Sequence, residues 1–281
     1  MDLNFDEIDK TIKSDEAIID FSSLYNDCLI DLSEEMPRPE IILSIGNYNY
    51  KGEYYPNPIM TAGEFSAIIA QSKAKKSFLK SAFLGAYIGG NANVLFPNIK
   101  SHRGEENYTV LDFDTEQGKY YTQRTFRRVQ EMAGGIYENY KGFATRHLSS
   151  DNRLKLIDYV LSNQATLFKN PVKLVAIDGI ADLVENTNDI LMSKEASDYV
   201  MRWTYEYNLH ITTVIHKSPQ TGKPLGHLGT FVLKKAETVI ELDINEDGSV
   251  KVTNPYSRGY KFDEFNFDIN KDALPYLIEN F

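Results

Sequence analysis

The sequence has one cysteine, Cys28, no long apolar run and no excess of positive charge. A single cysteine excludes an internal disulfide and a cysteine-rich zinc site. The five histidines show no metal-ligand spacing, so we expect no structural metal. No stretch approaches the roughly 18 apolar residues that span a bilayer, and the first ten residues, MDLNFDEIDK, are acidic where a secretory signal is basic. We therefore expect a cytoplasmic protein without membrane contact.

Negative charge is concentrated at one end of the chain. The 281 residues carry 40 acids and 30 Lys or Arg, and residues 1–40 alone hold twelve of those acids and three of those bases. Residues 41–281 are left with 28 acids and 27 bases. The acidic total argues against nucleic acid, because phosphate contacts need a basic surface. The nearly neutral main part can still present a basic face, so nucleic-acid binding stays open.

This contrast predicts an acidic helical arm over residues 1–40 and one main domain over residues 41–281. The arm has the apolar spacing of one or two amphipathic helices, ending before Pro37 and Pro39. Its apolar positions are Ile8, Ile12, Ile18, Ile19, Phe21, Leu24, Leu29, Ile30 and Leu32. Two interpretations remain open, since the arm can pack on its own domain or grip a neighbouring subunit.

The main domain alternates short apolar runs with helical patterns, which predicts an α/β fold with a mostly parallel sheet covered by helices on both faces. Expected strands are Ile41–Ile45, Phe65–Ala70, Thr109–Phe113, Leu174–Asp178, Ile211–Ile215, Thr238–Leu242, Val250–Thr253 and Phe265–Ile269. Expected helices are Lys76–Ile88, Tyr120–Met132, Asn152–Leu167 and Ser193–Tyr207. A hairpin turn at Asn245–Gly248 suggests a C-terminal antiparallel extension.

A degenerate phosphate-binding loop follows one of these strands. In the pattern G-x-x-x-x-G-K-[ST], backbone N–H groups surround phosphates, a lysine reaches the β and γ phosphates, and a hydroxyl holds Mg²⁺. Lys76 and Ser77 fit the pattern, but Ala70 and Lys75 replace both glycines. A basic surface turn is the alternative. The candidate nucleotide-binding residues are Ala70, Gln71, Ser72, Lys73, Ala74, Lys75, Lys76, Ser77 and Phe78.

Three later strands end in polar residues at the edge where α/β sheets bind ligands. Asp178 can hold Mg²⁺ together with Ser77, or it can cap the next turn. Glu116 can orient and deprotonate the water that attacks the γ phosphate, or it is an exposed loop acid. His216 can sense the γ phosphate, or it is structural.

Taken together, these motifs resemble the RecA-like ATPase core of the DnaB and RepA class of hexameric helicases, over about residues 40–275. The runs that carry the resemblance most closely are similar to ATPases encoded by bacterial mobile elements and phages. They are GEFSAIIAQSKAKKSF, VLDFDTEQ, LVAIDGIADLV, VIHKSPQTGKPLGHLGTFVLKKAETVIEL and SRGYKFDEFNFDI. The resemblance implies a RecA-like fold in which Lys76 and Ser77 form the Walker A pair, Asp178 is the Walker B acid, Glu116 the catalytic carboxylate and His216 the sensor.

The same resemblance implies that Arg258 serves ATP bound in an adjacent subunit. Tyr256 stands where those helicases carry a lysine, and a solvated hairpin charge is the alternative for Arg258. A glycine-rich loop over residues 222–230 matches loops that hold single-stranded DNA in that class. Alternatively, it closes over nucleotide or joins subunits. The implied DNA-binding residues are Lys223, His227, Lys234 and Lys235.

The leading hypothesis is an ATP-binding and ATP-hydrolysing motor or clamp that uses Mg²⁺ and acts on DNA in replication or transfer of a mobile element. It would assemble as a homo-oligomer, with a hexameric ring that uses the arm, on single-stranded DNA. A second hypothesis is a nucleotide-binding interaction protein without motor activity, because replacing both loop glycines affects hydrolysis more than binding. A phosphate-transferring enzyme is a third, weaker alternative, since no lid or acceptor site is evident.

Overall fold

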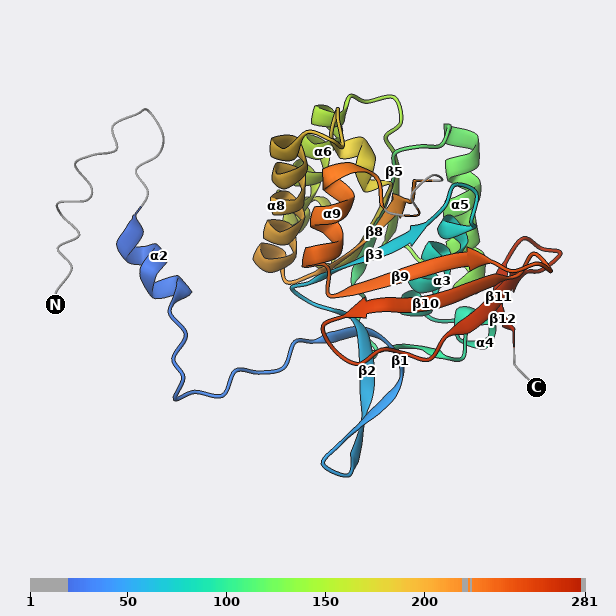
Figure 1. Cartoon of the computed structure of the whole chain (residues 1–281), viewed down its shortest axis with the longest axis horizontal. Helices are drawn as coiled ribbons and strands as arrows, with labels where there is room; N and C mark the ends of the chain where they lie inside the picture. Colours follow the sequence, from blue (N-terminus) through green and yellow to red (C-terminus); the bar gives the residue numbers. More distant parts are fainter. Residues whose placement is uncertain (1–19, 219–221, 223, 279–281) are drawn as a thin grey trace. The chain divides into compact units, whose positions relative to one another are not determined.

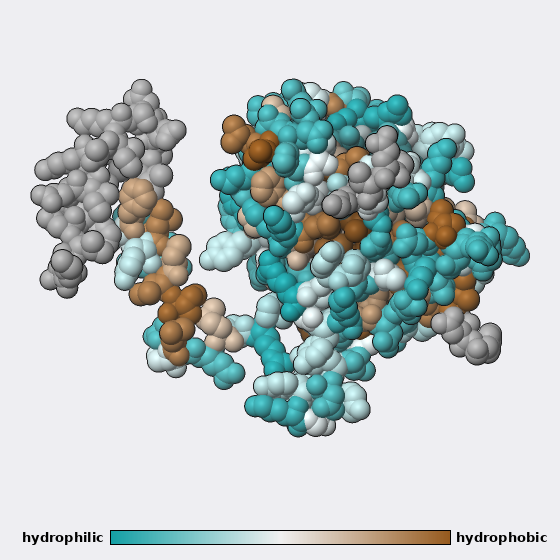
Figure 2. Space-filling view, viewed as in Figure 1, coloured by the Kyte–Doolittle hydropathy of each residue, from teal (hydrophilic) through white to brown (hydrophobic). Residues whose placement is uncertain are grey.

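The computed structural model of the chain describes residues 20–218, 222 and 224–278. Its internal contacts separate residues 1–38 from residues 39–281. In the first unit, α2 (Phe21–Cys28) begins at Asp20, whose carboxylate accepts hydrogen bonds from the N–H groups of Ser22 and Ser23. None of the eight residues of α2 is buried, and Figure 2 shows apolar side chains along it. The arm positions Ile8 to Ile19 lie outside the described residues.

The second unit is built on a nine-stranded sheet (Figure 1). Six strands, from β9 to β6 in the order below, are parallel, and the last three of the chain add to β9 in antiparallel fashion. This confirms the expected mostly parallel sheet with an antiparallel extension. The order is β12 (Pro275–Ile278), β11 (Phe265–Ile269), β10 (Val250–Ser257), β9 (Thr238–Ile244), β3 (Phe65–Ala70), β8 (His210–His216), β7 (Val172–Asp178), β5 (Thr109–Asp114), β6 (Tyr140–Ala144).

Helices cover both faces of this sheet (Figure 1). One face carries α3 (Lys76–Ile88), α4 (Ala92–Leu95) and α5 (Lys119–Met132). The other carries α6 (Ser150–Ser162), α7 (Gln164–Leu167), the 3₁₀ turn η2 (Ile180–Leu183), α8 (Ile190–Tyr207) and α9 (Gly226–Lys235). Two apolar cores result, with Phe83 in the first and Trp203 in the second, both fully buried. Strands buried on both faces are continuously apolar, which explains the short apolar runs. Among the described helices, none is long and apolar enough to cross a membrane.

Three strands escaped prediction because their sequences are polar or contain proline. A small antiparallel sheet of β2 (Glu53–Thr61), β1 (Ile41–Tyr50) and β4 (Ile99–Ser101) packs its buried residues into the first core. Its β2 contains Pro56 and Pro58 and lies at the edge, where prolines are tolerated. Strand β6 is an edge strand of the large sheet, and its YKGFA sequence is only partly buried. Edge strands need fewer apolar residues, so the pattern missed them.

Two expected elements were wrong in detail. The single helix predicted over 152–167 is divided at Asn163 into α6 and α7. The glycine-rich loop predicted over 222–230 is largely helical, because α9 begins at Gly226. A Cβ on Gly226 would lie 2.3 Å from the carbonyl oxygen of Thr187, and one on Gly229 would lie 2.6 Å from Pro224. These glycines therefore allow α9 to pack closely on its neighbours.

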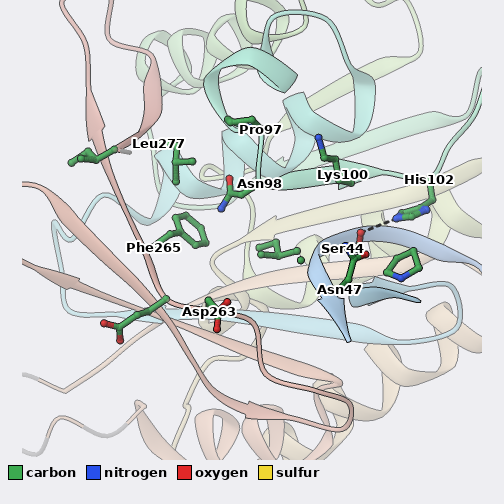
Figure 3. Close-up of a pocket in the computed structure, with 14 residues that line it drawn as sticks. Ser44, Asn47, Pro97, Asn98, Lys100, His102, Asp263, Phe265 and Leu277 are labelled. Carbon is green, nitrogen blue, oxygen red and sulfur yellow. Dashed lines mark hydrogen bonds between the residues drawn. The ribbon is translucent and has the colours of Figure 1, made fainter. Parts of the chain in front are cut away.

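A cavity of about 480 Å³ lies between the small sheet and the C-terminal strands (Figure 3). At one wall, the Ser44 hydroxyl is hydrogen bonded to Nε2 of His102 at 2.8 Å. Asp263 and Phe265 face the cavity from the C-terminal side. None of the predicted nucleotide-binding or metal-binding residues lines it, so it is separate from the site described below.

Buried His210 makes the stability of the fold depend on pH. Its ring nitrogens lie 2.8 Å from the carbonyl oxygen of Thr61 and 3.0 Å from the Ser66 hydroxyl. Burial lowers the pKa of His210 to about 4 from an ordinary 6.5. The unfolded chain therefore takes up this proton first as the pH falls, and the stability present above pH 6.5 is lost toward pH 4, on the order of 3 kcal/mol.

Denaturant unfolding between pH 7 and pH 4 tests this prediction in the wild type and in His210→Gln. Nearby Glu237, whose pKa is raised by burial, titrates in the opposite sense and is common to both proteins. The difference between the two curves therefore isolates His210. Parallel curves would show that His210 does not contribute.

Candidate functional site

The predicted site residues converge at one edge of the sheet. Strands β3, β8, β7 and β5 are parallel neighbours, and their last residues pair in register, Ala70 with His216 and Asp114 with Asp178. The segments that follow these strands consequently meet. They enclose a cavity of about 410 Å³ whose walls include Ser72–Phe78, Glu116, Gln117, Asp178 and His216.

The loop between β3 and α3 uses left-handed backbone at two lysines. Lys73 has a φ of 64° and Lys75, which precedes the first residue of α3, has a φ of 58°. This conformation favours glycine. The Lys75 ammonium donates a hydrogen bond to the carbonyl oxygen of Gly248 at 2.7 Å and lies 3.4 Å from the Asp268 carboxylate. Lys75 thus ties the phosphate-loop segment to the turn between β9 and β10.

Lys76 is the centre of a polar chain that crosses the cavity. Its ammonium is nearly buried and donates to the carbonyl oxygens of Gln71 at 2.8 Å and Ala70 at 3.4 Å, and to Nδ1 of His216 at 2.9 Å. Burial lowers the pKa of Lys76, while the charges of Glu116 and Asp178 oppose that shift. All three protons of the ammonium therefore have acceptors within the chain.

His216 connects this lysine to Glu116. Its Nε2 lies 2.9 Å from Oε1 of Glu116. Because Nδ1 accepts a proton from Lys76, we assign the remaining ring proton to Nε2, which donates it to Glu116. A Cβ on Gly179 would lie 3.0 Å from the same Glu116 oxygen, so glycine allows this carboxylate to approach β7 closely. The structure thus links Lys76, His216 and Glu116 in one hydrogen-bonded chain.

Ser77 and Asp178 form the second part of the site. The Ser77 hydroxyl donates to Oδ2 of Asp178 at 2.8 Å. A hydroxyl and a carboxylate are hard oxygen ligands, which suit Mg²⁺. In the part of the chain that the structure describes, no group of three or more His, Cys, Asp or Glu side chains could hold a metal alone. These two residues therefore fit an ion that phosphate oxygens also bind, as Mg²⁺ commonly is.

Asp114 orients the segment that carries Glu116. Its carboxylate accepts hydrogen bonds from the N–H groups of Glu116 at 3.1 Å and Gln117 at 2.8 Å, and from the Gln117 amide at 2.9 Å. Thr115 adds backbone contact to β7, because its N–H donates to the Asp178 carbonyl oxygen at 2.8 Å. The chain direction after β5 is fixed by these bonds, and with it the position of Glu116.

Sequence reasoning missed a buried ion cluster behind the site. Lys80 of α3 lies 2.8 Å from Oδ1 of Asp112 and 3.3 Å from Oδ2 of Asp178, and the side chains of Lys80 and Asp112 are both 0% exposed. Tyr140 donates to Oδ2 of Asp112 at 2.8 Å. Burial alone would lower the pKa of Lys80, but the charges of Asp112 and Asp178 outweigh it and the pKa is raised. The available signal was a lysine within the otherwise apolar stretch that follows Ser77.

The remaining predicted residues lie elsewhere. Arg258 follows β10, whose Ser257 pairs with the first residue of β9, so Arg258 lies at the opposite edge of the parallel strands. Its guanidinium contacts the Glu64 carboxylate at 2.6 Å and the Lys235 carbonyl oxygen at 2.7 Å. Lys234 and Arg258 line a separate cavity of about 890 Å³.

The predicted DNA-binding residues are only partly described. His227 and Lys234 are exposed on α9, and Lys235 is paired with Asp198 at 2.9 Å. Lys223 lies outside the described residues. The structure therefore does not bring this group together with the Lys76 site.

The arrangement of sheet, loop and helix is that of an ATPase domain fold. Among solved structures, the chain is similar to the ATPase domain of a DnaB-like helicase, with a TM-score of 0.54 and 14% sequence identity over 77% of this chain and 85% of that one. No family model and no curated protein matches the sequence. The similarity therefore establishes the RecA-like α/β fold, and roles for the site residues must be argued from their geometry.

The left-handed backbone at Lys75 leads to a stability prediction. Lys75→Ala loses the bond to Gly248 and keeps the unfavourable φ, whereas Lys75→Gly loses the same bond and removes the unfavourable φ. We expect Lys75→Gly to be more stable than Lys75→Ala by about 1 kcal/mol, measured by denaturant unfolding. Equal stability, or a more stable alanine variant, would contradict the left-handed conformation.

Proposed function

We propose that this protein binds ATP with Mg²⁺ at the β3–α3 loop and hydrolyses it. The observation that supports this most is the hydrogen-bonded chain Lys76–His216–Glu116 beside the Ser77–Asp178 pair. A polyphosphate is the ligand that uses a loop of backbone N–H groups, a helix N-terminus and a lysine together. Glu116 supplies a carboxylate for the water, which a site that only binds phosphate does not need.

In the proposed reaction, the α3 N-terminus and the loop N–H groups hold the phosphates. Lys76 exchanges its bond with His216 for one with a phosphate oxygen, so that His216 reports the nucleotide to Glu116. Glu116 accepts a proton from the attacking water while orienting it toward the γ phosphorus. Ser77 and Asp178 would hold Mg²⁺, which supplies charge neutralisation at the β and γ phosphates.

Completion of the site by a second copy follows from the position of Arg258. Within one chain this residue lies at the opposite sheet edge, so it can serve only ATP bound to a neighbouring subunit. We propose a homo-oligomeric, hexameric ring joined in part by the arm, in the cytoplasm. It would act as a helicase-like motor or clamp on single-stranded DNA, in replication or transfer of a mobile element. The proposed DNA contacts are Lys223, His227, Lys234 and Lys235.

A nucleotide-binding interaction protein without motor activity is the second candidate. Two observations favour it: the left-handed Lys75 in place of glycine, and the three internal acceptors of Lys76. Both oppose rapid exchange between free and bound states of the loop. In this case the exposed apolar face of α2 would serve a partner protein.

Substitution at Glu116 separates binding from hydrolysis. We expect Glu116→Gln to bind a fluorescent ATP analogue as the wild type does and to release phosphate about 10²–10³-fold more slowly, because the amide cannot accept the proton. Lys76→Ala is the blank for binding, and exposed Glu138→Gln is the matched control. Each protein is assayed with and without single-stranded DNA.

The outcomes distinguish the two candidates. DNA-stimulated phosphate release that is lost in both site variants supports the motor or clamp. Tight binding without release above the Lys76→Ala blank supports the interaction protein. Wild-type behaviour of both site variants would contradict the site assignment itself.

A further inference from the structure

A buried lysine lies directly behind the residues proposed to hold Mg²⁺. Lys80 is on α3, one turn after Ser77, and Asp112 lies on β5. Both side chains are completely buried. An apolar pair of similar volume often gives equal or greater stability than a buried ion pair, because removing charges from water is costly. The cluster therefore calls for an explanation other than packing.

Lys80 is shared between two carboxylates. It lies 2.8 Å from Asp112 and 3.3 Å from Asp178, so Asp112 is the closer partner. Tyr140 donates to the other oxygen of Asp112 at 2.8 Å and fixes the orientation of that carboxylate. The ammonium is thereby held toward Asp112 while it remains within reach of Asp178.

The contact with Asp178 falls on the oxygen that Ser77 also uses. Oδ2 of Asp178 accepts from the Ser77 hydroxyl at 2.8 Å and faces the Lys80 ammonium at 3.3 Å. A cation at this position reduces the negative potential that Asp178 presents to a metal ion. It also fixes the carboxylate from behind, as partners of metal ligands do.

We propose that Lys80 is a positioning residue that sets how strongly Asp178 attracts Mg²⁺, with Asp112 and Tyr140 restraining Lys80. This inference rests on the proposed function, because it concerns the same metal. If Asp112 loses its charge, the attraction of Lys80 is directed to Asp178 alone and competes with Mg²⁺. If Lys80 is removed as well, the competition ends.

The test is a Mg²⁺ titration of fluorescent ATP-analogue binding, with binding in EDTA as the baseline. We expect Asp112→Asn to raise the Mg²⁺ concentration at half-maximal effect by about tenfold. The asparagine keeps the size of the side chain and an acceptor for Tyr140. In the double variant Asp112→Asn with Lys80→Met, we expect the value to return to that of the wild type or below it.

Two further measurements separate this role from a merely structural one. Tyr140→Phe removes one hydrogen bond and no charge, so we expect a shift of less than about threefold in the same direction. Thermal unfolding of each variant reports its stability, and the double variant has no unpaired charge in the cluster if Asp112→Asn alone does not fold.

The order of the Mg²⁺ values decides the result. Asp112→Asn above the wild type, with reversal in the double variant, supports the inference. If all folded variants agree within twofold while their unfolding temperatures differ, the cluster is only structural and the inference is overturned. If the wild type binds no nucleotide with Mg²⁺, the proposed function fails first and the inference fails with it.

Discussion

Parallel pairing of strands buried on both faces is the constraint on which this structure depends. A strand within such a sheet has few positions for an uncompensated polar side chain, so polar residues gather where the strands end. In β3, β8, β7 and β5 the carboxyl ends coincide in register. Lys76, Glu116, Asp178 and His216 come from four distant parts of the chain, yet they meet because the strands before them are neighbours.

Where a charge does lie inside the core, it is paired. Lys80 and Asp112 are the clearest case, and their contact with Asp178 joins the core to the site. His210 solves the same problem in a different way, since burial keeps it neutral. Stability and function are therefore coupled around β5 and β7, and a change in the buried cluster is felt at the side chains proposed to hold the metal.

Much of this arrangement could be predicted from the sequence, because its strongest signals are local. Strand β3 and helix α3 have the predicted limits, since the change from an apolar run to a helical period is sharp at Lys76. The edge strands β2 and β6 carry no comparable pattern. Helix α9 was hidden by Gly226 and Gly229, whose role is close packing against Thr187 and Pro224. Local sequence does not contain such distant contacts.

The candidate site was accessible for the same reason, and its limits are equally physical. Strand ends are visible in sequence, so Glu116, Asp178 and His216 could be selected. The bonds that join them, and the tether from Lys75 to Gly248, depend on the folded chain. The two replaced glycines differ for a structural reason: Ala70 ends β3 with no need for a positive φ, whereas Lys75 has a left-handed backbone.

The central claim is that His216 connects Lys76 to Glu116 and that nucleotide breaks this connection. Nitrogen-15 NMR of the His216 ring, assigned with His216→Gln, tests it most directly. Without nucleotide, the account predicts a neutral ring with its proton on Nε2. Addition of Mg²⁺ and ADP with a γ-phosphate mimic should shift the Nδ1 resonance as Lys76 withdraws. An unchanged spectrum with nucleotide bound would contradict the account.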